Sequence, residues 1–169
     1  MPTTTTENLI LNKQQIEQKI SRIAYEIYEN NYLEKKLFIA GIPSGYKLAK
    51  LLVEELKKIS PFDITLLKVE FKKGKPSADS ITVDCKPDDL KNQVLILVDD
   101  VLLTGRTFMH SLRPFLDVDI KKIETVVLVN RSHKLFPISP NYTGYELATT
   151  LNDHIEVVLD PGNFGVYLY

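Results

Sequence analysis

The chain has 169 residues, the size of one domain, and the composition of an ordinary folded protein. Hydrophobic residues make up 44% and charged residues 25%, which excludes a chain that is disordered throughout. The formal net charge of −1 argues against binding of nucleic acid or of an anionic membrane through bulk positive charge. Cys85 is the single cysteine, so a disulfide framework and a zinc site made of cysteines are excluded. Neither a signal peptide nor a membrane-length apolar run is visible, so we expect one domain over 1–169, with a frayed lead-in at 1–8, in the reducing cytoplasm.

The first half of the chain predicts two amphipathic helices and two strands. From 12 to 31, four isoleucines recur at intervals of 4, 3 and 4 residues, which is the spacing of one helix face. A short apolar strand is expected over 37–40, before a loop at 41–45 that contains glycine and proline. A second amphipathic helix follows, and Ser60-Pro61 ends it. The stretch 62–71 is predicted to be a strand.

The second half carries the most apolar strand, preceded by a polar insertion at 72–92. That insertion has little apolar pattern, so we expect a mobile, functional loop. The run 94–98 is apolar on both faces, as in a buried parallel strand. A helix is predicted over 107–116, and further strands over 123–129, 157–159 and 166–168. The alternation of strands and helices predicts an α/β fold with a central, mostly parallel twisted sheet that is flanked by helices.

The segment 94–107 carries the chemistry. It places two adjacent carboxylates, Asp99 and Asp100, directly after the buried strand, at the edge of the sheet where open α/β folds bind ligands. A turn into a helix follows, made of Thr104, Gly105, Arg106 and Thr107. Such a turn offers hydroxyl and backbone N–H donors to a phosphate, while the carboxylates suit the vicinal hydroxyls of a ribose. The order of these features favours a ribose 5-phosphate site over a plain helix cap and turn, and it matches neither a Walker A loop nor a Rossmann fingerprint.

The sequence around this segment resembles a known family. Val98 to Thr107 is similar to the phosphoribosyl-pyrophosphate signature of type I phosphoribosyltransferases. The chain as a whole is most similar to the pyrimidine operon attenuator/uracil phosphoribosyltransferase family. The likeness extends to the segments 10–31, 63–66, 127–138 and 141–144, which is nearly the whole chain. It implies the type I phosphoribosyltransferase fold, with a small hood at about 130–155 beside the sheet.

The resemblance also implies roles for individual residues. Asp99 and Asp100 would hold the ribose hydroxyls and contact the cofactor Mg²⁺ through water, and the turn 104–107 would bind the 5-phosphate. The loop that would face pyrophosphate comprises Gly41, Ile42, Pro43, Ser44 and Gly45. The 72–92 segment would close over the site. Its lysines Lys72, Lys73 and Lys75 would face pyrophosphate or, equally well, solvent. The implied substrates are phosphoribosyl pyrophosphate and a nucleobase.

The chain departs from the family pattern in the pyrophosphate loop and around the base. The family usually has Gly-Ile-x-x-Arg-Gly in this loop, whereas this chain has one residue fewer and lacks the Arg. Pyrophosphate would lose a charge-assisted donor unless Lys47 or another cation replaces it. Leu103 stands where purine-type relatives have an Asp that is thought to deprotonate the purine, which disfavours that chemistry. The other base-pocket candidates are Asn130, Arg131 and Tyr145; an amide at Asn130 matches either base edge, and Tyr145 either covers a base or packs in the core.

Three functions remain open at this point. The first is transfer of ribose 5-phosphate to a nucleobase, with uracil preferred. The second is a regulatory protein of pyrimidine metabolism that binds phosphoribosyl pyrophosphate or a nucleotide with little turnover, and the third is a purine-type transferase. RNA binding is disfavoured, because the family's basic RNA surface is kept only at Arg22, His133 and Lys134, while Ser139 replaces a further Arg. The resemblance implies a homodimer or larger homo-oligomer and no membrane partner.

Overall fold

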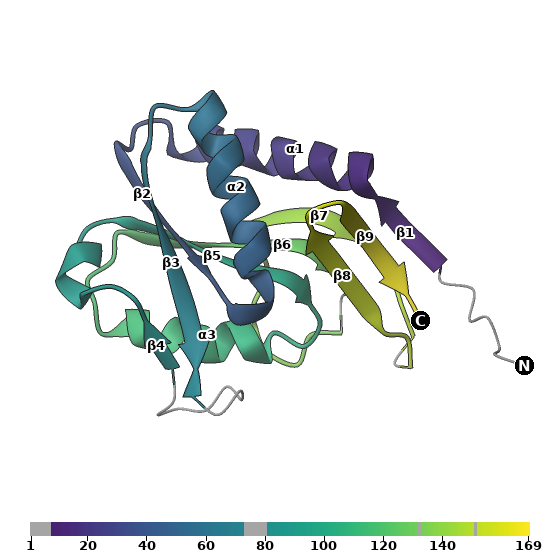
Figure 1. Ribbon diagram of the computed structural model, residues 1–169. Coiled ribbons are helices and arrows are strands. Elements are labelled where there is room, and N and C mark those ends of the chain that lie inside the picture. Colours follow the sequence, from purple (N-terminus) through teal and green to yellow (C-terminus); the bar gives the residue numbers. More distant parts are fainter. Residues whose placement is uncertain (1–7, 73–80, 132, 151) are drawn as a thin grey trace, which may run out of the picture.

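The computed structural model describes residues 8–72, 81–131, 133–150 and 152–169, which form a six-stranded sheet with helices on both faces and a three-stranded sheet beside it (Figure 1). In chain order the elements are β1 (Asn8–Asn12), α1 (Lys13–Asn31), β2 (Lys36–Gly41), the 3₁₀ turn η1 (Pro43–Gly45), α2 (Tyr46–Ile59), β3 (Asp63–Phe71), β4 (Ile81–Val83), the 3₁₀ turn η3 (Pro87–Leu90), β5 (Val94–Leu102), α3 (Arg106–Leu116), β6 (Lys122–Asn130), β7 (Tyr142–Glu146), β8 (Ile155–Asp160) and β9 (Asn163–Leu168). Within the described ranges, no helix combines the length and the apolar character that a membrane crossing needs.

The main sheet has the strand order β4-β3-β2-β5-β6-β7. The pairs β2–β3, β2–β5, β5–β6 and β6–β7 are parallel, and only the short edge strand β4 runs antiparallel, against β3. The prediction of a mostly parallel α/β sheet is therefore confirmed. Because β5 lies between β2 and β6, its carboxyl end is flanked by the loops that follow those two strands. Gly41 of β2 lies opposite Val98, and Asn130 of β6 lies opposite Leu102.

Two hydrophobic cores hold the helices to the sheet. On one face, the isoleucine stripe of α1 and the leucines of α2 pack on the sheet, and all four predicted isoleucines are buried. On the other face, Phe108 and Phe115 of α3 pack on the sheet. Helix α1 begins where its sequence dictates, because the Asn12 side chain accepts a hydrogen bond from the Gln15 N–H and the Gln15 side chain accepts one from Asn12. The hydrophobic patterns therefore fix which helix covers which face.

The second sheet joins the two ends of the described chain. Strand β9 lies between β1 and β8 and pairs antiparallel with both, so the amino-terminal and carboxyl-terminal strands are neighbours (Figure 1). Leu11, Ile155 and Val166 of these strands are buried in the same core as α1 and α2. The small sheet is therefore packed on the α1 and α2 side of the molecule.

Three parts of the chain differ from the sequence predictions. Asn8, expected in the frayed lead-in, begins β1, because β9 supplies its hydrogen-bonding partners. The insertion at 72–92, expected to be a mobile loop, contains β4 and η3, since β4 pairs with β3; residues 73–80 lie outside the described ranges. The segment 130–155, expected to be a hood, contains β7, which belongs to the main sheet through its pairing with β6.

Candidate active site

Asp99 and Asp100 lie near the carboxyl end of β5, as the sequence predicted. Asp99 is only 4% exposed, and Asp100 is half-buried. The Asp99 carboxylate accepts hydrogen bonds at Oδ1 from the Ser44 hydroxyl at 2.6 Å and from the Asp100 N–H at 2.8 Å. The Asp100 carboxylate accepts one from the Val101 N–H at 2.7 Å. Short hydrogen bonds thus hold both carboxylates near the carboxyl end of β5.

The two carboxylates resist ionisation in the fold. Burial raises the pKa of Asp99, and the hydrogen bond from Ser44 opposes that rise. Burial and then the neighbouring charge of Asp99 raise the pKa of Asp100 to about 8. Two adjacent acids that cannot both ionise at low cost form a site that favours a bound cation or a hydroxyl donor. An acidic pair with raised pKa values at the end of a central strand is a candidate functional site.

The turn after β5, which the sequence predicts to bind a phosphate, leads into α3. Gly105 has φ of +87°, a left-handed conformation that a side chain would strain, and it caps α3. The first N–H groups of α3 point toward this turn and have no partner within the helix. Within the turn, the Arg106 N–H donates to the Thr104 hydroxyl oxygen at 3.3 Å. With Thr107 in the first helical turn, the four predicted residues of the phosphate turn are brought together.

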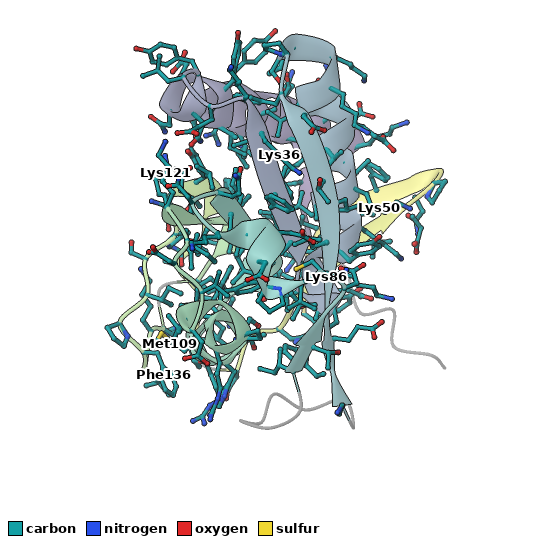
Figure 2. The ribbon with its side chains drawn as sticks, turned by 90° about the vertical axis from the view of Figure 1, so that its left-hand side faces the viewer. Lys36, Lys50, Lys86, Met109, Lys121 and Phe136 are labelled. Carbon is teal, nitrogen blue, oxygen red and sulfur yellow. The ribbon has the colours of Figure 1, made fainter. Side chains whose placement is uncertain are left out.

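The side chain of Arg106 is engaged beside the turn rather than over it. Its guanidinium lies 5.0 Å from the centroid of the Phe136 ring, a cation–π contact. The Phe136 N–H also donates to the Thr104 carbonyl at 3.0 Å, so the segment after β6 packs on the phosphate turn. Figure 2 shows Phe136 near Met109 of α3, and both line the same surface groove. The backbone, rather than the Arg106 guanidinium, is thus the donor set that the turn presents.

The loop after β2 packs directly against the acidic pair. Gly41 ends β2, Ile42 is fully buried, and Pro43, Ser44 and Gly45 form η1. A Cβ on Gly45 would lie 2.4 Å from the Asp99 Cα, so a side chain at this position cannot fit. The predicted pyrophosphate loop and the predicted ribose carboxylates are therefore neighbours in space, although Ser44 and Asp99 are 55 residues apart.

Cations near this loop differ from those expected. Lys47, the expected substitute for the missing Arg, forms an exposed ion pair with Asp160 of the small sheet. Sequence reasoning missed Lys68 of β3, which lies opposite Gly41 in the sheet and whose ammonium lies 5.6 Å from the centroid of the Tyr46 ring. The sequence signal that could have identified Lys68 was its position near the end of the strand predicted over 62–71. Of the three loop lysines, Lys72 is exposed, and the other two, at 73 and 75, lie outside the described residues.

The four base-pocket candidates separate into two groups. Leu103 follows β5 and is 37% exposed, and the buried Asn130 ends the neighbouring strand β6, with its amide donating to Glu146 at 3.2 Å. Asn130 lies opposite Leu102, the last residue of β5, so these two candidates are at the same end of the sheet as the acidic pair. Arg131 and Tyr145, however, have structural contacts that account for them. The Arg131 guanidinium donates to the Thr149 hydroxyl and to the carbonyls of residues 150 and 153.

Tyr145 packs against the core below α1, and the ammonium of Lys19 lies 5.4 Å from its ring centroid. These contacts favour the core-packing alternative for Tyr145 over a role as a cover for the base.

The donor set fits Mg²⁺ in the manner expected. Carboxylate oxygens are ligands that Mg²⁺ prefers, and it usually keeps several waters and takes substrate phosphates as further ligands. Among the described residues, no group of three or more His, Cys, Asp or Glu side chains gathers to hold a metal by itself. Asp99 and Asp100 would supply the protein side, and the substrate and water the remainder.

Comparison with known proteins places the chain in a family. The sequence matches the phosphoribosyl transferase domain over residues 7–162. It is 34% identical over 162 residues to the Bifunctional protein PyrR of Bacillus pumilus, covering 90% of each chain. It is 29% identical over 159 residues to the Bifunctional protein PyrR of Haemophilus ducreyi, covering 89% of each chain.

Solved structures agree on the fold. A hypoxanthine-guanine phosphoribosyltransferase from Bacillus anthracis has a TM-score of 0.77 over 96% of each chain at 14% identity. The hypoxanthine phosphoribosyl transferase of Trypanosoma cruzi has a TM-score of 0.74 over 95% of this chain and 89% of that one, also at 14% identity. The sequence resemblance is confirmed, and the chain belongs to the phosphoribosyl transferase domain family and is a phosphoribosyltransferase.

Proposed function

We propose that this protein transfers the ribose 5-phosphate of phosphoribosyl pyrophosphate to uracil and releases pyrophosphate. One observation carries the proposal. Asp99 and Asp100 at the end of β5, the phosphate turn at the start of α3 and the loop that holds Ser44 meet at one edge of the sheet. This arrangement offers separate partners for the ribose hydroxyls, the 5-phosphate and the pyrophosphate.

The chain's own residues would act mainly by positioning. Thr104 and the N–H groups that begin α3 hold the 5-phosphate, and the two carboxylates accept hydrogen bonds from the ribose hydroxyls. A ring nitrogen of the base attacks the anomeric carbon, and the bond from that carbon to the pyrophosphate oxygen breaks. The proton of the nitrogen passes to water or to the departing pyrophosphate, and the ribose carries positive charge in between. The nearby carboxylates favour that charge. Mg²⁺, when bound, neutralises the charge of the departing pyrophosphate.

Uracil is the base that the residues near the acidic pair support best. Leu103 has no group that accepts a proton from a purine ring. Asn130 carries both a donor and an acceptor, which can pair with a carbonyl and an imide N–H of a pyrimidine. The family resemblance points to the same base. The sequence resemblance also implies a homodimer or larger homo-oligomer, and we include it and a cytoplasmic location in the proposal.

The proposal is tested by pyrophosphate release with Mg²⁺ and phosphoribosyl pyrophosphate across uracil, hypoxanthine, guanine, xanthine, adenine and orotate. We expect release with uracil and much slower or no release with the five other bases. The variant carrying both Asp99→Asn and Asp100→Asn should lose activity and keep its fold, whereas Asp119→Asn, at an exposed aspartate, should match the wild type. Release with a purine in place of uracil would overturn the choice of base, and full activity in the double variant would overturn the site.

A regulatory protein with little turnover is the second candidate, and the pyrophosphate loop favours it. The exposed residues of that loop, Pro43 and Ser44, carry no charge, and Lys47 is paired with Asp160. In this case phosphoribosyl pyrophosphate would raise the melting temperature without releasing pyrophosphate with any base.

RNA is a poorer fit as a partner. The Arg22 guanidinium donates to Glu26 and to the carbonyls of Thr143 and Gly144. The His133 ring donates through Nε2 to the Thr149 carbonyl at 2.7 Å. Two of the three residues that match the family's RNA surface are thus engaged within the fold. A gel-shift titration that shows salt-dependent RNA binding would contradict this assessment.

A further inference from the structure

We propose that Ser44 is a positioning residue for the ribose site: its hydroxyl holds the Asp99 carboxylate in the orientation that receives the ribose, and it thereby links the pyrophosphate loop to the ribose carboxylates. The inference deepens the proposed function and rests on it. Ser44 belongs to the predicted pyrophosphate loop, so a role in binding ribose is not one that its place in the sequence suggests.

The geometry of the Asp99 carboxylate carries the inference. Both of its short hydrogen bonds, from the Ser44 hydroxyl at 2.6 Å and from the Asp100 N–H at 2.8 Å, converge on Oδ1. Two donors on one oxygen fix the plane of the carboxylate and so fix where Oδ2 lies. Asp99 is 4% exposed, so the orientation of its carboxylate is set mainly by protein donors. Removing the Ser44 hydroxyl should therefore let the carboxylate rotate.

The backbone around Ser44 makes this hydrogen bond a link between two parts of the site. The Ile42 N–H donates to the Val98 carbonyl at 3.0 Å, and the Gly45 N–H donates to the Ile42 carbonyl at 2.8 Å. Gly45 approaches Asp99 too closely for a side chain. The loop is thus seated on the end of β5, and any shift of the loop moves the hydroxyl relative to the carboxylate. A ligand on the loop and a ligand on the carboxylates would each alter the same hydrogen bond.

The contact is separable from the stability of the fold. Ser44 is an exposed residue in the short turn η1, so its replacement by alanine opens no buried cavity. Ser60 offers a matched control, because its hydroxyl donates a hydrogen bond of the same length, 2.6 Å, to the Leu56 carbonyl at the far end of α2. Ser44→Ala and Ser60→Ala thus remove the same group and a hydrogen bond of the same length, the first to a carboxylate and the second to a backbone carbonyl.

The test is the affinity for ribose 5-phosphate, a ligand without pyrophosphate, measured by calorimetry. We expect Ser44→Ala to raise the Kd about five- to tenfold, the size of one ordinary hydrogen bond, with a melting temperature near that of the wild type. Ser60→Ala should leave the Kd unchanged. Ser44→Thr and Ser44→Val have nearly the same shape and differ in the hydroxyl, so Thr should bind like the wild type and Val like Ala.

The outcomes separate this inference from the proposed function. If the wild type binds ribose 5-phosphate and the Ser44 variants bind it equally well, the role of Ser44 is overturned and the proposed function stands. The same holds if Thr and Val weaken binding alike, because shape rather than the hydroxyl would then matter. If the wild type binds neither ribose 5-phosphate nor phosphoribosyl pyrophosphate, the proposed function fails and this inference fails with it.

Discussion

Replacing Asp100 by asparagine should make the stability of the fold less dependent on pH and raise it at neutral pH. Burial and the Asp99 charge raise the pKa of Asp100 from 3.8 to about 8. The folded protein therefore keeps a proton on this side chain that the unfolded chain releases, over a window from about pH 4 to pH 8. Because the folded state binds more protons in that window, raising the pH favours unfolding. Asparagine is neutral at every pH and has no such dependence.

The size of the effect follows from the same shift. One proton difference changes the free energy of unfolding by about 1.4 kcal/mol per pH unit. Between pH 5 and pH 7 the wild type should therefore lose up to about 3 kcal/mol more than Asp100→Asn. For a domain of this length, 1 kcal/mol corresponds to roughly 2–4 °C in Tm. The Tm difference between variant and wild type should thus grow by several degrees across these two pH units.

Thermal unfolding followed by circular dichroism at pH 5, 6, 7 and 8, without divalent cations or ligands, measures this difference. Because Asp99 and Asp100 interact, the substitution also changes the ionisation of Asp99, so the difference between the two curves reports the titration of the acidic pair. The remaining titrating groups are common to both proteins. Asp119→Asn removes a charge from an exposed position and should run parallel to the wild type. Parallel curves for Asp100→Asn and the wild type would refute the reasoning, because they would mean that Asp100 ionises in the fold as it does in water.

Three further substitutions test contacts that shape the site and the core. Gly45→Ala should destabilise by about 2 kcal/mol or more, because its Cβ would lie 2.4 Å from the Asp99 Cα; an unchanged midpoint in urea would contradict this. Arg131→Ala should cost about 2–3 kcal/mol and speed amide exchange around Thr149, since three hydrogen bonds are lost; unchanged exchange would contradict the structural role. Glu124→Gln should cost about 1–3 kcal/mol, because two side-chain donors bind its two oxygens and glutamine has one acceptor; a neutral result in urea denaturation would contradict it.

The hydrophobic pattern of the sequence predicted the central strand and the first helix, because burial alone sets the pattern of apolar residues in these elements. The run at 94–98 is buried on both faces of the sheet, and an isoleucine stripe can belong only to a helix that lies on a core. The edges of the fold were missed for a physical reason. Strand β1 exists through its pairing with β9, more than 150 residues away, and such a partner leaves no local signal. Strand β7 contains Gly144, and a glycine in a sequence usually indicates a turn. In the structure this glycine lies within the strand, because a Cβ there would lie 2.6 Å from the Leu128 carbonyl oxygen.

In the candidate site, too, the features with a local sequence signal were predicted and those that depend on distant contacts were not. The acidic pair and the phosphate turn are contiguous in sequence, so their spacing predicts a ribose 5-phosphate site without any structure. The contact between Ser44 and Asp99 and the position of Lys68 beside Gly41 depend on the order of strands in the sheet. Strand order is set by packing of the whole chain, which is why these features became visible only in the structure.

The central claim is that the carboxyl end of β5 and the start of α3 hold a ribose 5-phosphate. A crystal structure with uridine 5′-monophosphate, the product of the proposed reaction, tests it most directly. We expect the phosphate on the N–H groups of 104–107, the ribose hydroxyls on Asp99 and Asp100, and the uracil ring beside Leu103 and Asn130. A nucleotide bound at another surface, or bound here with its ribose turned away from the carboxylates, would contradict the account.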